Sequence, residues 1–494
     1  CSAFELVEMQ FFVHKNHLIL YLCCRGEKVR GCEIILNHIR QIMKGLIQDK
    51  AFYKDLASIA APIIIQNFIS TSLNTVDTVM IGMVGETQIA AVGIANQFFM
   101  LFSMFLFGIC SGSGIFISQF WGKKDTENIK HVVGIEIFST LTVSAVFTLA
   151  ALFSSVNIIG IFNKDAEVLL YGSSYLRLVS ISYAFTAVTF CFSFALRCTE
   201  KAVYPMIVSA VALLGNTFLN YVFIFGHFGF EAMGVEGAAL ATVIARFIEA
   251  ALIVAIVYRK NKILAPNLKD IFIINGVFFK KIYRTTVPVL LNEVCWGLAF
   301  VIYSVAYGRI GKEAIASIQI SNTVQNLFMI LCFGMANASG VMIGKRIGAG
   351  DEGEGRDYAH RFAMLSIFTG IFIGFMVLVS GPLILGFFNV SQRVLIDSYQ
   401  IIKINSLIMP LRVFNIVIIV GILRGGGDAK HAFIIEASTM WFIGVPLAFA
   451  GAILFKLPIY WVVALTTLEE AGKFIFCMYR LVSGKWLNNL VKNF

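Results

Sequence analysis

The chain has 494 residues, of which 58% are hydrophobic and only 14% are charged, and its mean hydropathy is +0.82. Soluble domains carry roughly a quarter charged residues, and a folded soluble protein cannot hide this much apolar surface from water. The composition therefore excludes a soluble enzyme and predicts a protein whose solvent is lipid. The net charge of +10 does not indicate nucleic-acid binding, because Lys and Arg gather in particular loops between apolar runs.

Residues 1–42 precede the first long apolar run, and we expect them to be a poorly ordered extension. Their short apolar patch is interrupted by His14, Lys15 and His17, so it is too broken to span a bilayer. No small-residue cleavage site follows the patch, which disfavours a secretory signal. Met43, just before an amphipathic lead-in, would be a sensible start of the folded protein.

About twelve apolar runs follow, each long enough to cross a bilayer as a helix, since about 20 residues suffice for one crossing. Their length and their recurrence along the whole chain predict an all-α integral membrane protein. The predicted spans cover residues 57–82, 89–118, 132–156, 168–195, 203–226, 234–258, 283–307, 314–344, 360–386, 396–422, 431–455 and 457–481.

The first span contains one ionisable side chain, that of Asp77. A charge at the centre of a bilayer costs at least ~2.5 kcal/mol, so such residues face a cavity or a partner and are commonly functional. Spacings of three and four residues place four polar side chains on one helix face: Asn67, Ser70, Asn74 and Asp77. We predict that this face has a function, the alternative being a polar packing stripe.

Lys and Arg are concentrated in the loops after the even-numbered spans, including the linker 259–282 between the sixth and seventh spans. The loops after odd-numbered spans are short and contain fewer cations. Because cytoplasmic loops of membrane proteins are enriched in Lys and Arg, both termini and this linker are predicted to be cytoplasmic. We therefore expect a multi-pass protein of the plasma membrane, which is the inner membrane of a bacterial cell.

The seventh span combines an acid with aromatic side chains on one helix face. The spacing of three and four residues aligns Glu293, Trp296, Phe300, Tyr303 and Tyr307. Such a face suits flat lipophilic cations, through charge and cation–π attraction. The alternative is an aromatic packing seam.

The remaining motifs argue against cofactors. The ten cysteines show no CxxC pair and no cluster with His, so we predict reduced, small apolar side chains and neither a disulfide framework nor a metal site made by them. No Walker A sequence is present, so ATP is not the direct energy source.

The chain repeats itself at an offset of 226 residues, as between Pro62 and Pro288. FYKDLASIAAP (52–62) resembles FFKKIYRTTVP (278–288), and SGSGIFISQFWGKKD (111–125) resembles NASGVMIGKRIGAGD (337–351). A repeat of this length holds six spans, so both halves keep the same orientation. We predict two homologous six-helix lobes, 43–258 and 283–494, related by a pseudo-two-fold axis around a central cavity, which suits alternating access.

Two six-span lobes that carry VGETQIAAVG (84–93) and IGKEAIASIQ (310–319) resemble the multidrug and toxin extrusion (MATE) family, bacterial type. The resemblance covers about residues 52–485. It implies a secondary active antiporter, not an enzyme, that exports organic cations or drugs in exchange for Na⁺ or H⁺, with no other cofactor. The implied partners are small lipophilic or cationic molecules and membrane lipids but no nucleic acid, and we expect a monomer.

The resemblance places the coupling ion in the first lobe. Asp77 matches a first-helix acid, Asn216 and Asn220 match a fifth-helix polar pair, and Thr242 matches a sixth-helix hydroxyl. One carboxylate with several neutral oxygens suits a hard cation such as Na⁺, and a carboxylate that accepts a proton would serve H⁺ equally. The alternative for the two asparagines is a role in joining helices by hydrogen bonds.

The resemblance also bears on the substrate cavity and on the second lobe. Glu293 matches a seventh-helix acid, and Pro62 matches a first-helix proline associated with bending. Some members carry an acid in the tenth helix, whereas this chain has Arg412 and Val413 there, which argues against a cation site in the second lobe. The residues predicted to line the substrate cavity are Glu293, Trp296, Tyr303, Asn67 and Asn74.

Three other functions compete with this interpretation. A flippase of lipid-linked sugar precursors, from a MATE-related class, would favour several Arg side chains around a pyrophosphate, but cations within the spans are few. A membrane enzyme would need a catalytic cluster at a span end, and the seven His residues are scattered. A channel would not need the repeat of two lobes, which favours alternating access.

Overall fold

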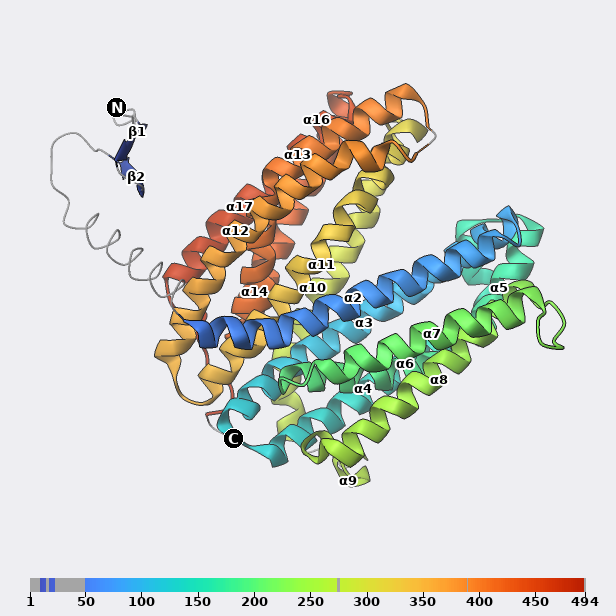
Figure 1. Ribbon diagram of the computed structural model, residues 1–494, viewed down its shortest axis with the longest axis horizontal. Coiled ribbons are helices and arrows are strands. Elements are labelled where there is room, and N and C mark those ends of the chain that lie inside the picture. Colours follow the sequence, from blue (N-terminus) through green and yellow to red (C-terminus); the bar gives the residue numbers. More distant parts are fainter. Residues whose placement is uncertain (1–8, 15–16, 23–48, 273–275, 389, 493–494) are drawn as a thin grey trace. The chain divides into compact units, whose positions relative to one another are not determined.

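The computed structural model describes the chain except residues 1–8, 15–16, 23–48, 273–275, 389 and 493–494, and it divides into two units, 1–50 and 51–494. In the N-terminal unit, strands β1 (Met9–His14) and β2 (His17–Leu22) pair antiparallel, with Met9 opposite Leu22 (Figure 1). The prediction that 1–42 is poorly ordered falls mostly on residues outside the described part of the chain.

The first lobe comprises seven helices that correspond to the first six predicted spans. Helices α5 and α6 form one of these spans together, bent by 51° at the residues between them. The bounds are α2 (Lys50–Gly82), α3 (Glu86–Lys123), α4 (Thr126–Phe162), α5 (Ala166–Ser180), α6 (Tyr183–Cys198), α7 (Val203–Phe225) and α8 (Gly234–Lys260).

The linker contains two short helices, η1 (Lys262–Leu264) and α9 (Leu268–Phe272). The backbone of Asp270 lies so close to α4 that a Cβ on Gly134 would meet its carbonyl oxygen, and His131 of α4 contacts the Asp270 carboxylate at 3.0 Å. This part of the linker is therefore packed against the first lobe.

The second lobe begins earlier than predicted, because α10 (Gly276–Gly308) starts seven residues before 283. Three of its segments are π-helical turns, η2, η3 and η4, inside otherwise α-helical spans. The other bounds are α11 (Lys312–Gly348), α12 (Glu352–Leu385), α13 (Gln392–Ile416), η2 (Val417–Leu423), α14 (Ala429–Thr439), η3 (Met440–Gly444), α15 (Val445–Phe449), η4 (Ala450–Leu454), α16 (Ile459–Thr466) and α17 (Leu468–Val482).

The repeat is visible in the positions of the helices. Helices α2, α3, α4, α5 and α7 begin at residues 50, 86, 126, 166 and 203, and their counterparts begin 226 residues later, at 276, 312, 352, 392 and 429. The caps repeat too: Asp125 accepts from the backbone N–H of Asn128, and Asp351 accepts from that of Glu354. A side-chain oxygen there satisfies a backbone N–H that has no partner within the helix, so the same helix start is stabilised twice.

Among the described residues, ten helices are individually long and apolar enough to cross a membrane, and the bent pair α5–α6 makes eleven. The twelfth predicted span, 457–481, corresponds to α16 and α17, each of which is too short to cross a membrane by itself. Helix α17 carries three charged side chains that are buried in the structure: Glu469, Glu470 and Lys473.

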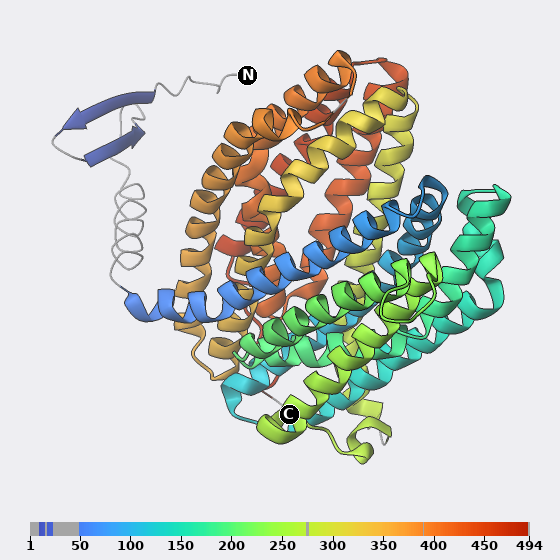
Figure 2. The same ribbon diagram turned by 45° about the vertical axis from the view of Figure 1, so that its right-hand side comes forward.

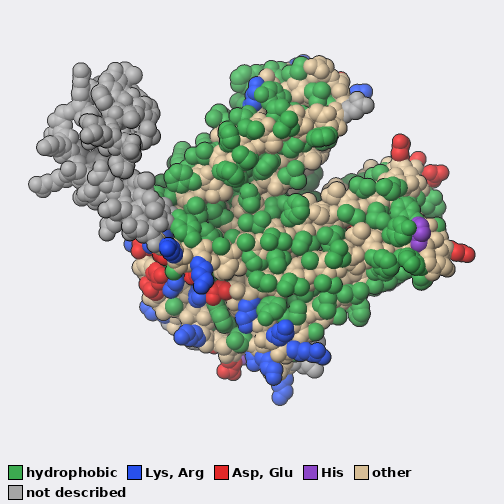
Figure 3. Space-filling model, in the orientation of Figure 1, with side chains coloured by type: hydrophobic (Ala, Val, Ile, Leu, Met, Phe, Trp, Pro, Cys, Tyr) green, Lys and Arg blue, Asp and Glu red, His purple; other side chains and the backbone are tan. Residues whose placement is uncertain are grey.

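The two lobes meet along α3, which packs against α10 and α11. Small residues allow this approach, since a Cβ on Gly112 would lie 2.7 Å from the Cα of Thr286. Figures 1 and 2 show the helices of the two lobes diverging from a shared end. Figure 3 shows a hollow between the lobes that opens away from the end where Lys and Arg gather, which we call the basic end.

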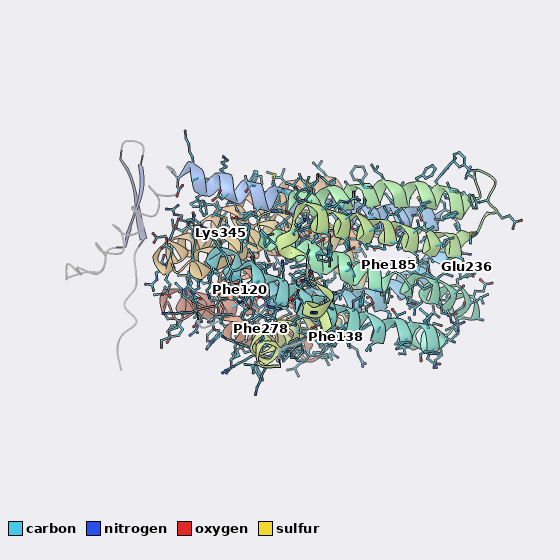
Figure 4. The ribbon with its side chains drawn as sticks, turned by 90° about the horizontal axis from the view of Figure 1, so that it is seen from below. Phe120, Phe138, Phe185, Glu236, Phe278 and Lys345 are labelled. Atoms are coloured by element: carbon cyan, nitrogen blue, oxygen red, sulfur yellow. The ribbon has the colours of Figure 1, made fainter. Side chains whose placement is uncertain are left out.

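The basic end is held closed by contacts between the lobes. Lys345 of α11 pairs with both oxygens of Glu200, which follows α6, at 2.7 and 2.8 Å. In Figure 4, Lys345 lies at the opposite end of the helical unit from Glu236, which is in the first turn of α8. Near the lobe contact, Phe120 of α3 stacks on Phe278 of α10.

A C-terminal tail, residues 484–492, crosses from one lobe to the other at the basic end. The side chain of Gln119 in α3 donates to the carbonyl oxygens of Gly425 and Asn488, at 3.3 and 3.2 Å, and accepts from the N–H of Leu490 at 2.8 Å. Trp486 is fully buried against Gly426 of the second lobe. The tail thus joins α3 of the first lobe to the second.

Candidate ion and substrate site

The structure brings the predicted ion-site residues of α2 and α7 together. The Nδ2 group of Asn220 donates to Oδ1 of Asp77 at 2.5 Å and to Oδ1 of Asn216 at 3.1 Å. Both asparagines are buried, at 0% and 1% exposure. One helical turn separates them, so α7 presents both amides to the face of α2 that carries Asp77.

Two polar atoms of this cluster have no hydrogen-bond partner within the described part of the chain: Oδ1 of Asn220 and Nδ2 of Asn216. An unpaired, buried acceptor next to a carboxylate costs free energy unless a donor or a cation occupies the space beside it. Thr242 of α8 donates to the backbone oxygen of Ala238 at 2.9 Å, and the phenol of Tyr175 lies beside Thr242 and Asp77. The oxygens around Asp77 are therefore mostly neutral.

A second set of polar residues, not predicted from the sequence, adjoins this site. Arg246 of α8 pairs with Oε2 of Glu249 at 2.8 Å and also interacts electrostatically with Asp77. The other oxygen of Glu249 accepts from Ser209 at 3.1 Å. The sequence does carry a signal for this set, because two charged residues three positions apart inside an apolar span are unusual and commonly functional.

The network continues across the first lobe. Ser209 also accepts from Nε2 of Gln66 at 3.1 Å, and Oε1 of Gln66 accepts from Arg197 at 2.7 Å. Gln66, Ser209 and Glu249 are all at most 6% exposed. A chain of hydrogen bonds thus connects α8 to α6 through the core of the lobe.

The other predicted residues of α2 do not join the cluster. Asn67 is half-buried and Asn74 is exposed, and their backbone oxygens accept from hydroxyls one turn later, those of Thr71 and Thr78. Pro62 is buried inside α2, which runs without a break from Lys50 to Gly82. The cavity role of the asparagines and the bending role of Pro62 remain predictions.

In the second lobe, Glu293 is not a free acid. Its Oε1 pairs with Nη2 of Arg424 at 2.7 Å, and Nη1 of Arg424 donates to Ser111 of the first lobe at 3.2 Å. Both charged side chains are largely buried, at 16% and 3% exposure. The positive charge of Arg424 offsets the attraction that Glu293 would offer to a cationic substrate.

The aromatic face of α10 divides between two environments. Trp296 packs on Phe300, with ring centroids 4.5 Å apart. Tyr303 is 8% exposed, and its hydroxyl donates to Oε2 of Glu469 in α17 at 2.6 Å. Tyr303 therefore belongs to the interior of the second lobe and does not offer its hydroxyl to a substrate in this conformation.

The interior of the second lobe holds charged pairs that the sequence does not predict. Glu470 accepts from Arg412 at 3.3 Å and from Asn415 at 2.8 Å, and Lys473 lies 3.4 Å from Glu469. The stretch of the tenth predicted helix around Arg412 and Val413 has no acid, and two acids lie on α17. A positive side chain lies beside each of these acids, so their negative charges are largely neutralised.

Besides the charged pairs, the described part of the chain holds free cysteines and a small cavity between the lobes, which Arg424 helps to line. The described cysteines are free, and five of them are buried, as predicted for small apolar side chains. Within the described residues, no group of three or more His, Cys, Asp or Glu side chains could hold a metal ion. The cavity between the lobes is lined by residues of both, including Ser111, Ser118, Phe194, Cys198, Asn337 and Arg424.

The family model MatE matches the chain twice, over residues 62–222 and 288–450. The uncharacterized transporter YisQ of Bacillus subtilis is 30% identical over 415 residues, which are 81% of this chain and 87% of YisQ. The probable multidrug resistance protein NorM of Thermotoga maritima is 25% identical over 448 residues, 88% of this chain and 93% of NorM.

Solved structures share the fold. A MATE structure in the bent conformation has a TM-score of 0.78 and 16% identity, covering 88% of this chain and 94% of that one. The eukaryotic MATE transporter AtDTX14 has a TM-score of 0.77 and 17% identity, covering 89% and 97%. With two matches of the family model at the spacing of the internal repeat, the chain belongs to the multidrug and toxin extrusion (MATE) family of membrane transporters.

Proposed function

We propose that the protein is a secondary active antiporter that exports drugs or other organic cations in exchange for Na⁺ or H⁺. The observation that carries this proposal is the Asp77 site, where a carboxylate inside a membrane-spanning helix meets the buried amide of Asn220. The unpaired oxygen of Asn220 adds a neutral ligand of the kind that Na⁺ accepts. A bound proton would neutralise the same carboxylate.

Exchange follows from competition for one negative charge. When Asp77 is empty and charged, the first lobe favours a cationic solute in the space between the lobes. When Na⁺ or H⁺ occupies Asp77, that charge is neutralised and the solute is released. A ligand shifts a conformational equilibrium only by its differential affinity for the two states, so occupancy of Asp77 must also bias the two arrangements of the lobes.

The architecture supports alternating access. The hollow between the lobes opens at one end, while the Glu200–Lys345 pair and the C-terminal tail close the basic end. Because positive residues favour the cytoplasmic side, this arrangement corresponds to an outward-open state with the C-terminal tail in the cytoplasm. Rocking of one lobe against the other would reverse it.

The substrate class is inferred from relatives and from the cavity. NorM of Thermotoga maritima and MdtK of Pectobacterium atrosepticum carry names of multidrug resistance proteins. Since Glu293 is offset by Arg424, we infer that recognition depends on aromatic and apolar surface, such as Trp296 and Phe300, together with the long-range attraction of Asp77.

A flippase of lipid-linked sugar precursors is the weaker candidate. It would require basic side chains around a pyrophosphate, whereas Arg424, which lines the cavity between the lobes, is neutralised by Glu293. The names of the relatives also favour drug export.

The experiment compares ethidium efflux from cells that express the wild type, Asp77→Asn or the control Asp357→Asn, which changes an exposed acid of α12. Efflux is driven by a Na⁺ gradient in one arm and by a pH gradient in the other. We expect Asp77→Asn to lose ion-driven efflux and Asp357→Asn to keep it. Undiminished ion-driven efflux by Asp77→Asn at equal expression would refute the role of the site, and transport of lipid-linked sugar without drug efflux would favour the flippase.

A further inference from the structure

Arg246 interacts with two carboxylates of the first lobe, those of Glu249 and Asp77. Its guanidinium is bonded to Glu249 at 2.8 Å, and among the described residues Asp77 forms no ion pair within 4.0 Å although Arg246 acts on it electrostatically. Thr242, Arg246 and Glu249 follow at spacings of four and three, so they share one face of α8. That face is the one that reaches the Asp77 site.

Glu249 is held on both of its oxygens. Oε2 receives Arg246, and Oε1 receives Ser209, whose hydroxyl is in turn bound by Gln66. The Glu249 side chain is 4% exposed, so water does not weaken these contacts. A carboxylate fixed in this way determines where the guanidinium of Arg246 rests.

The charges of the three ionisable groups sum to one negative unit when Asp77 and Glu249 are ionised and Arg246 is protonated. A single monovalent cation at Asp77 would therefore neutralise the group. If the Glu249 charge were absent, the only carboxylate of this group left to pair with the guanidinium would be that of Asp77. The guanidinium would then take the place of the external cation.

We propose that Glu249 and Arg246 set the affinity of Asp77 for its coupling cation, with Glu249 holding the guanidinium away from the carboxylate. This inference rests on the proposed role of Asp77 in ion coupling. Neither residue touches the transported solute in this account, so both are positioning residues. Tyr175 of α5 faces the same site and, as a phenol, adds no charge to this count.

Removing Glu249 or Arg246 should change the half-saturating concentration of the coupling cation in opposite directions. Glu249→Gln should raise the half-saturating concentration of the coupling cation by about tenfold or more, because Arg246 then competes for Asp77. Arg246→Met should lower it by about tenfold, because the competing cation is gone. The double variant removes both charges and should return the value to within about threefold of the wild type.

The measurement uses purified full-length protein in proteoliposomes, with ethidium transport recorded against Na⁺ concentration at fixed pH and against pH without Na⁺. The half-saturating concentration is determined for the cation, Na⁺ or H⁺, that drives ethidium transport by the wild type. The matched control is Glu236→Gln, which makes the same chemical change at an exposed acid in the first turn of α8. This control should leave the half-saturation value unchanged.

If the pair had only a structural role, the variants would reduce the amount of folded transporter or its maximal transport rate. They would not shift the half-saturating cation concentration in opposite directions. Suppose that Asp77→Asn abolishes coupling, but Glu249→Gln and Arg246→Met shift the half-saturating cation concentration in the same direction or not at all. That result would overturn this inference and leave the proposed function standing. Coupling that persists in Asp77→Asn would overturn both.

Discussion

Gln119 offers a direct test of whether the C-terminal tail stabilises the arrangement that is closed at the basic end. Its side chain is 0% exposed and makes three hydrogen bonds, two to the tail and one to Gly425 of the second lobe. Gln119→Ala removes all three. At about 0.5–1.5 kcal/mol for each bond, the closed arrangement should lose about 1.5–4.5 kcal/mol relative to one in which the tail has left α3.

A loss of this size changes the ratio of the two arrangements by roughly 10- to 2000-fold, since about 1.4 kcal/mol corresponds to a factor of ten. The assay is electron–electron double resonance between spin labels at Phe162→Cys and Phe387→Cys, in a background without the native cysteines. Both positions are exposed, at 58% and 89%, and lie at or just beyond the ends of α4 and α12 away from the basic end.

We expect Gln119→Ala to add a population with a shorter distance between the labels, as the lobes approach each other at the open end. The matched control is Gln97→Ala, an exposed glutamine of the same helix, which should leave the distribution unchanged. A distribution for Gln119→Ala that coincides with those of the control and the wild type would refute the reasoning that the tail stabilises the closed end.

Two further predictions concern the contact between the lobes. Gly112→Ala should force α3 away from α10 and lower the melting temperature, because the added Cβ would lie 2.7 Å from the Thr286 backbone. The control Gly93→Ala, on the same helix, places a Cβ that meets nothing within 4 Å and should be neutral or slightly stabilising. Equal melting temperatures for the two variants would contradict this prediction. Glu293→Gln should destabilise the protein by about 3–5 kcal/mol, because Arg424 is then buried without its charged partner. The double variant Glu293→Gln with Arg424→Met should recover part of that loss in a thermal unfolding measurement. No recovery in the double variant would show that the two side chains act separately.

The repeat and the spans can be predicted from the sequence because they depend on local chemistry. Apolar length marks a membrane helix, and the recurrence of Asp125 as Asp351 marks the same helix start in each lobe. The grouping of Asp77 with Asn216 and Asn220 follows from family resemblance and helical spacing, and the structure places them in contact.

The partners of the charged residues cannot be predicted in the same way. Glu293 and Arg424 are 131 residues apart, and Tyr303 and Glu469 are 166 apart, so no local pattern links them. Hydropathy indicates that a charge lies within the membrane part but not which opposite charge accompanies it. The sequence therefore presents Glu293 as a free acid, and only the packing of the helices shows its pairing with Arg424.

The two lobes share a backbone but not the proposed ion site, because the residue 226 positions after Asp77 is Tyr303. A duplicated scaffold with a carboxylate in only one copy has room for one monovalent ion per cycle at this pair of positions. If one such ion is exchanged for one singly charged drug, the cycle moves no net charge across the bilayer. Transport would then be electroneutral and would respond to the chemical gradient of the ion but not to the membrane voltage.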